Sequence, residues 1–391
     1  MHIPLHFTVE VLRKIALLLG LVCLLAPADG LAQEKHKKKI PLKDTLDGKL
    51  DVSAYLVEAH GFLPIPFVIT EPALGGIGGA LVPMFISPNK HATPEMGYVP
   101  PNITAAAGMY TGNGSWGTGA FRSASLPKIG MKYQVGIAYG DVNLAFYRQL
   151  PVVGERKFEF GIKALPIFVS LSKKIGHSAL YAGIKYRWMD TKLSPRFSGN
   201  LPDFIKPIEM DSKSGTMGVF LDYDKRNTVF TPDKGIRAKL AFNWDDNWTG
   251  SDYQFQKLKE SFLLYQPINS WWVGGLRLEG NQAFNDPPFY LQPGIDMRGV
   301  PAARYQGQET YLVETEQRFD LTSRWSVLAF GGWGTVVGKE ESFGKGQNVY
   351  NAGGGFRYLL ARLFKLRLGI DVAKGPDSWG WYIIVGHSWN R

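Results

Sequence analysis

The sequence predicts an all-β fold, a transmembrane antiparallel β-barrel of about sixteen strands. Three observations lead to this prediction: an N-terminal export signal, long segments in which apolar and polar residues alternate, and tryptophans near the ends of those segments. Charged residues make up 20% of the 391 residues and aromatic residues 13%. Such a composition suits a wall that meets lipid on one face and water on the other.

The first 32 residues have the pattern of a cleavable secretory signal peptide. Arg13 and Lys14 precede an apolar core, Ile15 to Ala26. This core is too short to span a bilayer, which takes about 20 residues. The chain's one cysteine, Cys23, lies within it. We therefore expect an exported chain without disulfides or cysteine metal sites.

A short periplasmic segment, residues 33–60, is expected to follow the signal. Its first part, Gln33 to Leu50, is rich in lysine and is predicted to be disordered or lightly ordered. The formal charge of +10 raises the question of nucleic acid. No helix-turn-helix, zinc or RNA-binding motif accompanies it, so we expect no nucleic-acid partner.

From residue 61 onward the alternation has a period of two. In Phe364–Val372 the apolar residues fall on one face and Lys365, Arg367 and Asp371 on the other. Ile236–Asp245 alternates in the same way. Successive side chains of a strand point to opposite faces of a sheet. A soluble β-sandwich is the alternative, but long strands with terminal tryptophans and an export signal favour a barrel over residues 61–391.

The expected strands can be counted back from the C-terminus. A long irregular stretch, 285–307, separates two groups of them. The segments are 379–389, 363–374, 347–361, 323–336, 308–320, 270–284, 251–267, 234–246, 213–224, 177–190, 155–174, 129–150, 103–124 and 75–86.

The stretch Asp222–Gly235, with Asp224, Arg226 and Pro232 inside it, forms a motif that resembles the strand-turn-strand signature of the BamA/TamA superfamily, also called the bacterial surface antigen family. Met297-Arg298-Gly299-Val300 resembles the motif of its lumen-entering loop, and Glu316-Gln317-Arg318-Phe319 the strand that follows. The end, with Gly386 and Trp389, is similar to the family's final strand.

The resemblance implies a barrel that assists insertion or passage of proteins or lipids through a weakly closed seam between its first and last strands. Family members that assemble other proteins carry periplasmic POTRA domains, whereas only about 28 residues separate the expected signal cut from Gly61 here. We therefore expect a POTRA-less member. In the strand after Glu316, Gly332 occupies the position of a family Asp that pairs with the loop Arg.

Arg298 is the first candidate site residue, together with Gly299. An arginine inside a barrel needs carboxylate partners, because losing water is costly. Glu314, Glu316 and Arg318 share one face of the strand 308–320 and are the candidate lumen partners. Our hypothesis is that Arg298 pairs with Glu316 or Glu314 in place of the missing Asp. The alternative is a solvated turn residue.

Asp222, Asp224 and Arg226 are interpreted as a local ion network at a barrel rim, before a turn that contains Pro232 and ends at Gly235. No metal site and no cofactor is predicted. Catalysis is not expected either: no hydrolase motif is present, and neighbours in a strand, such as His387 and Ser388, would point to opposite faces.

Three functions stay open. The first is assisted insertion or translocation, the second a passive anion-preferring pore lined by lysines and arginines, and the third a structural or surface-antigen barrel. The expected location is the outer membrane of a Gram-negative bacterium. The expected partners are outer-membrane lipid or lipopolysaccharide, the barrel assembly machinery during insertion, and an unknown client protein.

Overall fold

The computed structural model describes residues 42–58, 62–89, 91, 99–150, 154–198, 201–202, 205–339 and 341–389. The predicted signal peptide lies outside the described residues. No helix in the described ranges is long and apolar enough to cross a membrane. From Leu42 to the C-terminus the chain forms one compact unit.

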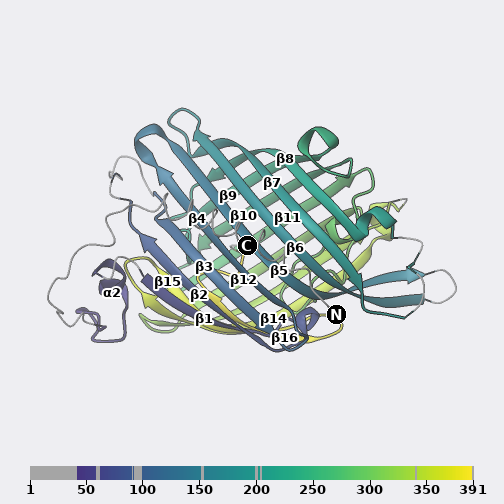
Figure 1. The fold of residues 1–391 in the computed structure, drawn as a ribbon. Coiled ribbons are helices and arrows are strands. Elements are labelled where there is room, and N and C mark those ends of the chain that lie inside the picture. The colour runs from purple at the N-terminus through teal and green to yellow at the C-terminus, as the bar shows by residue number, and fades with distance from the viewer. Residues whose placement is uncertain are drawn as a thin grey trace, which may run out of the picture. The chain divides into compact units, whose positions relative to one another are not determined.

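The fold is a sixteen-stranded antiparallel sheet curled into a barrel, as Figure 1 shows. Each strand pairs with its neighbours in the sequence, in the order β1 to β16. The strands are β1 (Phe62–Ile69), β2 (Gly78–Ser87), β3 (Asn102–Thr111), β4 (Trp116–Leu126), β5 (Met131–Leu150), β6 (Gly154–Lys174), β7 (Leu180–Pro195), β8 (Asp211–Asp224), β9 (Gly235–Asp245), β10 (Phe255–Pro267), β11 (Trp272–Phe284), β12 (Glu309–Asp320), β13 (Trp325–Val337), β14 (Gln347–Ala361), β15 (Leu366–Lys374) and β16 (Trp379–Val385).

Among the described residues, helical structure is confined to short pieces. The α-helix α2 (Ser53–Glu58) precedes β1. The 3-10 turns are η2 (Pro72–Leu74), η4 (Pro127–Ile129), η5 (Pro207–Met210), η6 (Asn247–Thr249), η7 (Phe289–Leu291) and η8 (Phe343–Lys345).

The predicted fold class is confirmed, but two strand assignments in the first part of the barrel are corrected. The segment 103–124 is two strands, β3 and β4, because Gly112-Asn113-Gly114 forms a turn between them. Phe62–Ile69, which we did not assign as a strand, is β1. Pro64 and Pro66 argue against a strand at the sequence level, since proline is rare in paired strands.

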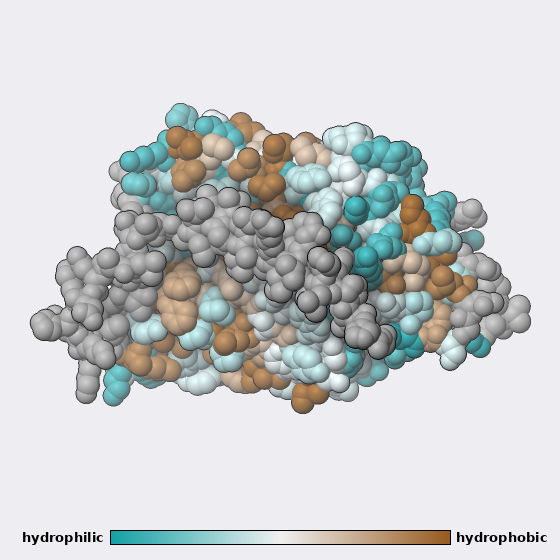
Figure 2. Space-filling model, in the orientation of Figure 1, coloured by the Kyte–Doolittle hydropathy of each residue, from teal (hydrophilic) through white to brown (hydrophobic). Residues whose placement is uncertain are grey.

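The two ends of the barrel differ. We call the end where β1 starts and β16 finishes the terminal end, and the other the loop end. Most connections at the terminal end are short, whereas the loop end carries the β5–β6 hairpin and the long segment 285–308. This is the asymmetry of outer-membrane barrels, whose short turns face the periplasm. Figure 2 shows apolar patches among the side chains of the outer wall.

The interior is filled mainly by the segment 285–308, which connects β11 to β12 and enters the lumen as predicted. Ile295, Met297 and Val300 from this segment pack with Leu312 of β12 and Val349 of β14 in a buried apolar cluster. This cluster holds the loop against the inner face of β12–β14 and so positions Arg298.

Of the segment Gln33 to Leu50, expected to be disordered or lightly ordered, residues 42–50 have defined structure and residues 33–41 lie outside the described residues. Lys43 and Leu50 form a β-bridge, and α2 follows. Leu56 of α2 is fully buried against the β14–β15 turn, with Leu63 of β1 and Val385 of β16 packed on the same cluster. The segment therefore crosses the terminal end next to the first and last strands.

Candidate functional site

The centre of the candidate site is Arg298, which has a side chain only 1% exposed. Its Nη1 lies 2.7 Å from Oδ2 of Asp371 and 2.8 Å from Oε2 of Glu316. Its Nη2 lies 3.5 Å from Oε1 of Glu314. The guanidinium also stacks 3.4 Å from the centre of the Phe330 ring. These contacts supply the carboxylates that a buried arginine requires.

Gly299 brings the loop backbone close to the wall. Its φ of +82° is in the left-handed region, and a Cβ there would lie 2.7 Å from the backbone nitrogen of Gly375. The Gly299 amide donates to the Tyr382 hydroxyl at 2.8 Å. The loop tip is therefore fastened to the β15–β16 connection and to β16 itself.

Two further arginines surround the same carboxylates. Arg277 of β11 lies 2.9 Å from Glu314, and Arg357 of β14 donates to Asp371 at 2.9 Å. Asn351 donates to Glu314 and to the Arg298 carbonyl. We call Arg277, Arg298, Glu314, Glu316, Arg357 and Asp371 the lumen network. Its members come from the inserted loop and from β11, β12, β14 and β15.

Sequence reasoning did not identify Asp371, which makes the shortest contact to Arg298. Its position on the polar face of Phe364–Val372 was a signal for a lumen carboxylate, but the alternation does not tell which strand faces the loop. Gly332, at the position of the family Asp, serves another purpose. A Cβ there would lie 2.8 Å from Cγ of Glu314, so glycine leaves room for this carboxylate.

The C-terminal residues join the lumen network, which corrects the predicted strand 379–389. β16 ends at Val385, and Gly386 turns the chain with a φ of +82°. Trp389 is then buried, where its Nε1 donates to Glu314 at 2.9 Å. We expected this tryptophan near the end of the final strand. The lumen can hold it because the indole N–H finds a carboxylate acceptor.

His387 and Ser388 both contact Glu316 rather than each other. The His387 Nε2 lies 3.3 Å from Glu316, and the Ser388 hydroxyl donates to the same carboxylate at 3.3 Å. Our reason for separating them, opposite faces of one strand, is wrong because these residues lie after β16. In the described residues no group of three or more potential ligands could hold a metal ion.

The strand-turn motif lies at the terminal end, between β8 and β9. Arg226 binds Asp224 at 2.8 Å, and Asp222 binds Arg237 of β9 at 2.8 Å. Gly235 has a φ of +110°, and a Cβ there would lie 2.2 Å from the Lys225 carbonyl. Pro232 lies within the turn.

Arg318 belongs to this end of the barrel and not to the Arg298 network, where we expected it. It binds Asp233 at 2.5 Å and Asp320 at 3.1 Å. Lys365 also binds Asp233. Burial raises the pKa of Asp233, but Arg318 and Lys365 outweigh it and lower the pKa to about 2. The β8–β9 turn is thereby tied across the terminal end to β12 and to the β14–β15 turn.

A second ion cluster fastens the segment before β1. Arg324, in the β12–β13 turn, is completely buried and binds Asp47 at 2.8 Å and Asp51 at 2.6 Å. It also binds Asp44 at 2.5 Å. Hydrogen bonds to Arg324 help to lower the pKa of Asp47 and Asp51 despite desolvation. We call Leu42–Glu58 the clasp, because it links the β12–β13 turn to the start of β1.

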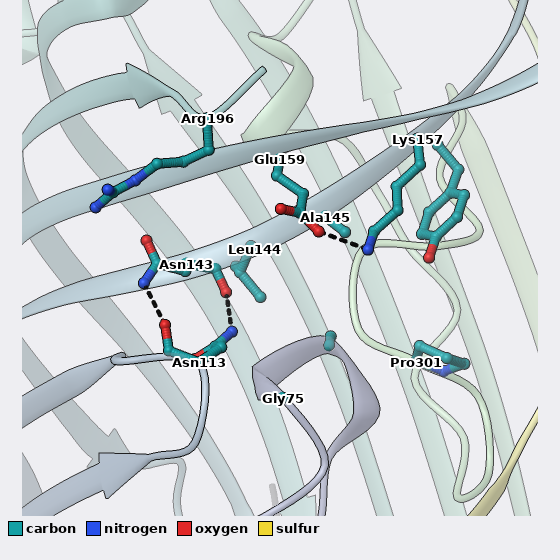
Figure 3. Close-up of a pocket in the computed structure, with 11 residues that line it drawn as sticks. Gly75, Asn113, Asn143, Leu144, Ala145, Lys157, Glu159, Arg196 and Pro301 are labelled. Carbon is teal, nitrogen blue, oxygen red and sulfur yellow. Dashed lines mark hydrogen bonds and ion pairs between the residues drawn. The ribbon is translucent and has the colours of Figure 1, made fainter. Parts of the chain in front are cut away.

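At the loop end a cavity of about 330 Å³ lies beside the β5–β6 hairpin. Figure 3 shows Asn113 and Asn143 in contact with each other in the lining of this cavity, and Lys157 pointing to Glu159. The two asparagines exchange hydrogen bonds of 2.9 and 2.8 Å, and the ion pair measures 2.5 Å. The asparagine contacts join the β3–β4 turn to β5, whereas the ion pair lies within β6.

Solved structures with this architecture include BamA from Haemophilus ducreyi lacking POTRA domains 1-3. It is 13% identical, with a TM-score of 0.55 over 83% of this chain and 69% of that one. CdiB from Escherichia coli is 11% identical, with a TM-score of 0.57 over 82% and 62%. CdiB from Acinetobacter baumannii is 11% identical, with a TM-score of 0.51 over 83% and 59%. The chain thus spans less than two thirds of the CdiB chains.

At this level of identity the likeness concerns the fold. No protein-family model matches the sequence, and no curated protein does. The fold and the loop-filled lumen define a class: the chain is a sixteen-strand β-barrel of the outer-membrane type. More particularly, it has the barrel architecture found in BamA and CdiB.

Proposed function

We propose that this protein is an integral outer-membrane barrel that assists the insertion or passage of proteins or lipids across a Gram-negative outer membrane. The observation that carries the proposal is the seam between β1 and β16. The sheet order begins at β1 and ends at β16, and no ladder joins these two strands, all of whose residues are described. Figure 1 shows them meeting in purple and yellow.

An unpaired seam matters in a membrane because lipid cannot satisfy backbone N–H and C=O groups. The other fifteen strand junctions are laddered, so the seam is where the wall opens at the lowest cost. The lumen network holds the inserted loop on β11–β15, beside the seam. The arrangement supports a lateral route through the wall more than a wide axial channel.

The test is to lock the seam. Cysteine pairs combine Pro64, Pro66 or Val68 of β1 with Trp381 or Ile383 of β16, in a chain that has no cysteine after the predicted signal. The purified protein is reconstituted in lipid vesicles, and the folding rate of an unfolded reporter barrel protein is measured before and after oxidation. We expect the reduced protein to accelerate folding and the oxidised protein to lose that effect.

The matched control is Ile370→Cys with Ile383→Cys. These positions face each other across the β15–β16 ladder, so their disulfide leaves the seam untouched. Acceleration should persist in the oxidised control. Equal acceleration by locked and unlocked seams would contradict the proposal.

A passive anion-preferring pore is the second candidate, and one observation favours it. Basic side chains of β7, β9 and β10 line the inner face, and within the described ranges no ion pair joins them to a carboxylate: Lys257 donates to the Leu291 carbonyl, and Arg187 to Thr216. The set consists of Lys185, Arg187, Lys239, Lys257 and Lys259. Fixed positive charge favours anions. Steady anion-selective current in planar bilayers, weakened by Lys259→Glu, would support this function.

A further inference from the structure

The two edges of the seam are not equivalent in their backbone hydrogen-bonding groups. In an antiparallel sheet the N–H and C=O of successive residues point alternately to the two neighbouring strands. The ladders on one side of β1 and β16 therefore determine which groups face the seam.

The even-numbered residues of β16 direct their backbone N–H and C=O groups to β15. The Gly386 amide donates to the Arg367 carbonyl at 2.7 Å, in register with the β15–β16 ladder. Trp379, Trp381, Ile383 and Val385 thus direct both N–H and C=O into the seam. None of the four is proline, so this edge has four donors and four acceptors.

On β1 the same reasoning places the even residues at the seam. The Gly112 amide donates to the Ile77 carbonyl at 2.6 Å. The backbone groups of odd-numbered residues in β2 therefore point to β3, and those of even-numbered residues point to β1. The partner of Gly78 in β1 is Ile69, and odd residues of β1 therefore bond to β2. The pairing of Pro64 with Pro83 agrees, because two prolines cannot exchange N–H bonds.

Pro64 and Pro66 consequently stand where β1 would donate to a strand in the seam. Only Phe62 and Val68 retain N–H groups on this edge, against four on β16. A strand laid along β1 would leave its own carbonyls unpaired opposite both prolines. Each unpaired group costs several kcal/mol in lipid, and proline on an edge is a recognised block to strand addition.

We infer that the strand-accepting edge of the seam is β16 and that β1 is disabled for this purpose. The occupant is an extended transmembrane strand of another outer-membrane protein, with N–H groups at every seam-facing position. Its alternate apolar side chains would continue the lipid-facing wall of Trp381, Ile383 and Val385. This inference rests on the proposed function, for which it names the edge and the kind of partner.

The experiment uses two peptides that differ only at positions 64 and 66, where one has backbone N–H donors and the other has prolines. One has the sequence Phe62–Ile69 with Pro64→Thr and Pro66→Thr, and the other keeps both prolines; both carry solubilising lysines and a terminal cysteine. The full mature protein, in vesicles, carries Ile383→Cys on β16 or Val68→Cys on β1. Disulfide cross-linking between peptide and protein is measured under mild oxidation.

We expect the threonine peptide to cross-link to Ile383→Cys at least about tenfold more than the proline peptide, since two hydrogen bonds separate them. Labelling of Val68→Cys should stay low with both. Restoring the donors of β1 in the protein, by Pro64→Thr and Pro66→Thr, should let β1 compete for β16 and reduce the labelling.

Equal labelling by the two peptides, preference for Val68→Cys, or no competition from the restored β1 would each overturn the inference. A cross-linked Ile383→Cys protein dimer that excludes the peptide would also overturn it, by making a second copy the occupant. If peptide labelling fails while the seam lock still abolishes reporter folding, the proposed function stands and only the edge assignment is lost.

Discussion

The Nη1 of Arg298 lies 2.7 Å from Oδ2 of Asp371, which follows it 73 residues later in the chain. Asp371 stands on β15 directly opposite Tyr382 of β16, and Tyr382 accepts the amide of Gly299. The inserted loop is therefore bound to the last two strands of the sheet. Its ion pair with Asp371 holds β15, and the Gly299 amide holds β16, the strand that borders the seam.

Removing the Arg298 side chain should destabilise the barrel by about 3–5 kcal/mol, because Asp371 and Glu316 would lose a buried counter-charge. The measurement is urea unfolding of Arg298→Ala in micelles. Arg304→Ala is the control: Arg304 pairs with Asp377 at 2.7 Å, but Asp377 is 39% exposed. A smaller loss for Arg298→Ala than for the control would contradict the account.

Trp389→Phe keeps an aromatic ring but deletes the N–H that Glu314 accepts. Glu314 keeps Arg277 and Asn351 as donors, and a buried acceptor that loses one of its donors costs at most about 1–3 kcal/mol. The lipid-facing Trp381, 40% exposed, provides the matched variant Trp381→Phe, for which we expect no loss. Thermal unfolding of the two variants is compared, and equal midpoints would argue against a structural role for the C-terminal turn.

The terminal end should weaken in acid through Asp233. Its pKa falls from 3.8 to about 2 on folding, so its stabilisation is present above pH 4 and disappears between about pH 4 and 2. The effect is about 2 kcal/mol. Unfolding of wild type and Asp233→Asn should therefore converge as the pH falls through this range. A constant difference between the two would rule out the ion pairs with Arg318 and Lys365 as its source.

Arg324→Gln should release the clasp, since Asp44, Asp47 and Asp51 would lose their shared counter-ion. Trypsin should then cut faster after Lys43 and Lys49, both of which lie within the clasp. The control is Lys192→Gln, which removes an exposed pair with Asp211 at the loop end. Unchanged cleavage in Arg324→Gln would mean that the apolar contacts of Leu56 and the ion pairs of Arg362 with Asp44 and Asp47 are enough to hold the segment.

The barrel and its approximate strand number could be predicted because alternation and turn residues are local signals, whereas the entry of the loop into the lumen was implied by the family resemblance of Met297–Val300. The partners of Arg298 could be predicted only in part. Glu314 and Glu316 lie on the next strand, whereas Asp371 meets the loop only after three further strands curl round the lumen. The C-terminal turn at Gly386 escaped prediction because Trp389 continues the alternation of β16. Only the contact of its indole N–H with Glu314 explains why Trp389 lies in the lumen.

The most direct test of the open seam is residue-resolved amide exchange along β16 in the refolded protein. The amides of Gly380, Tyr382 and Ile384 donate to β15 and serve as the internal control. We predict that Trp381 and Ile383 exchange much faster than these neighbours, because their N–H groups face an unpaired seam. Uniform protection along the strand would mean that β16 is laddered to β1, and it would contradict the central claim.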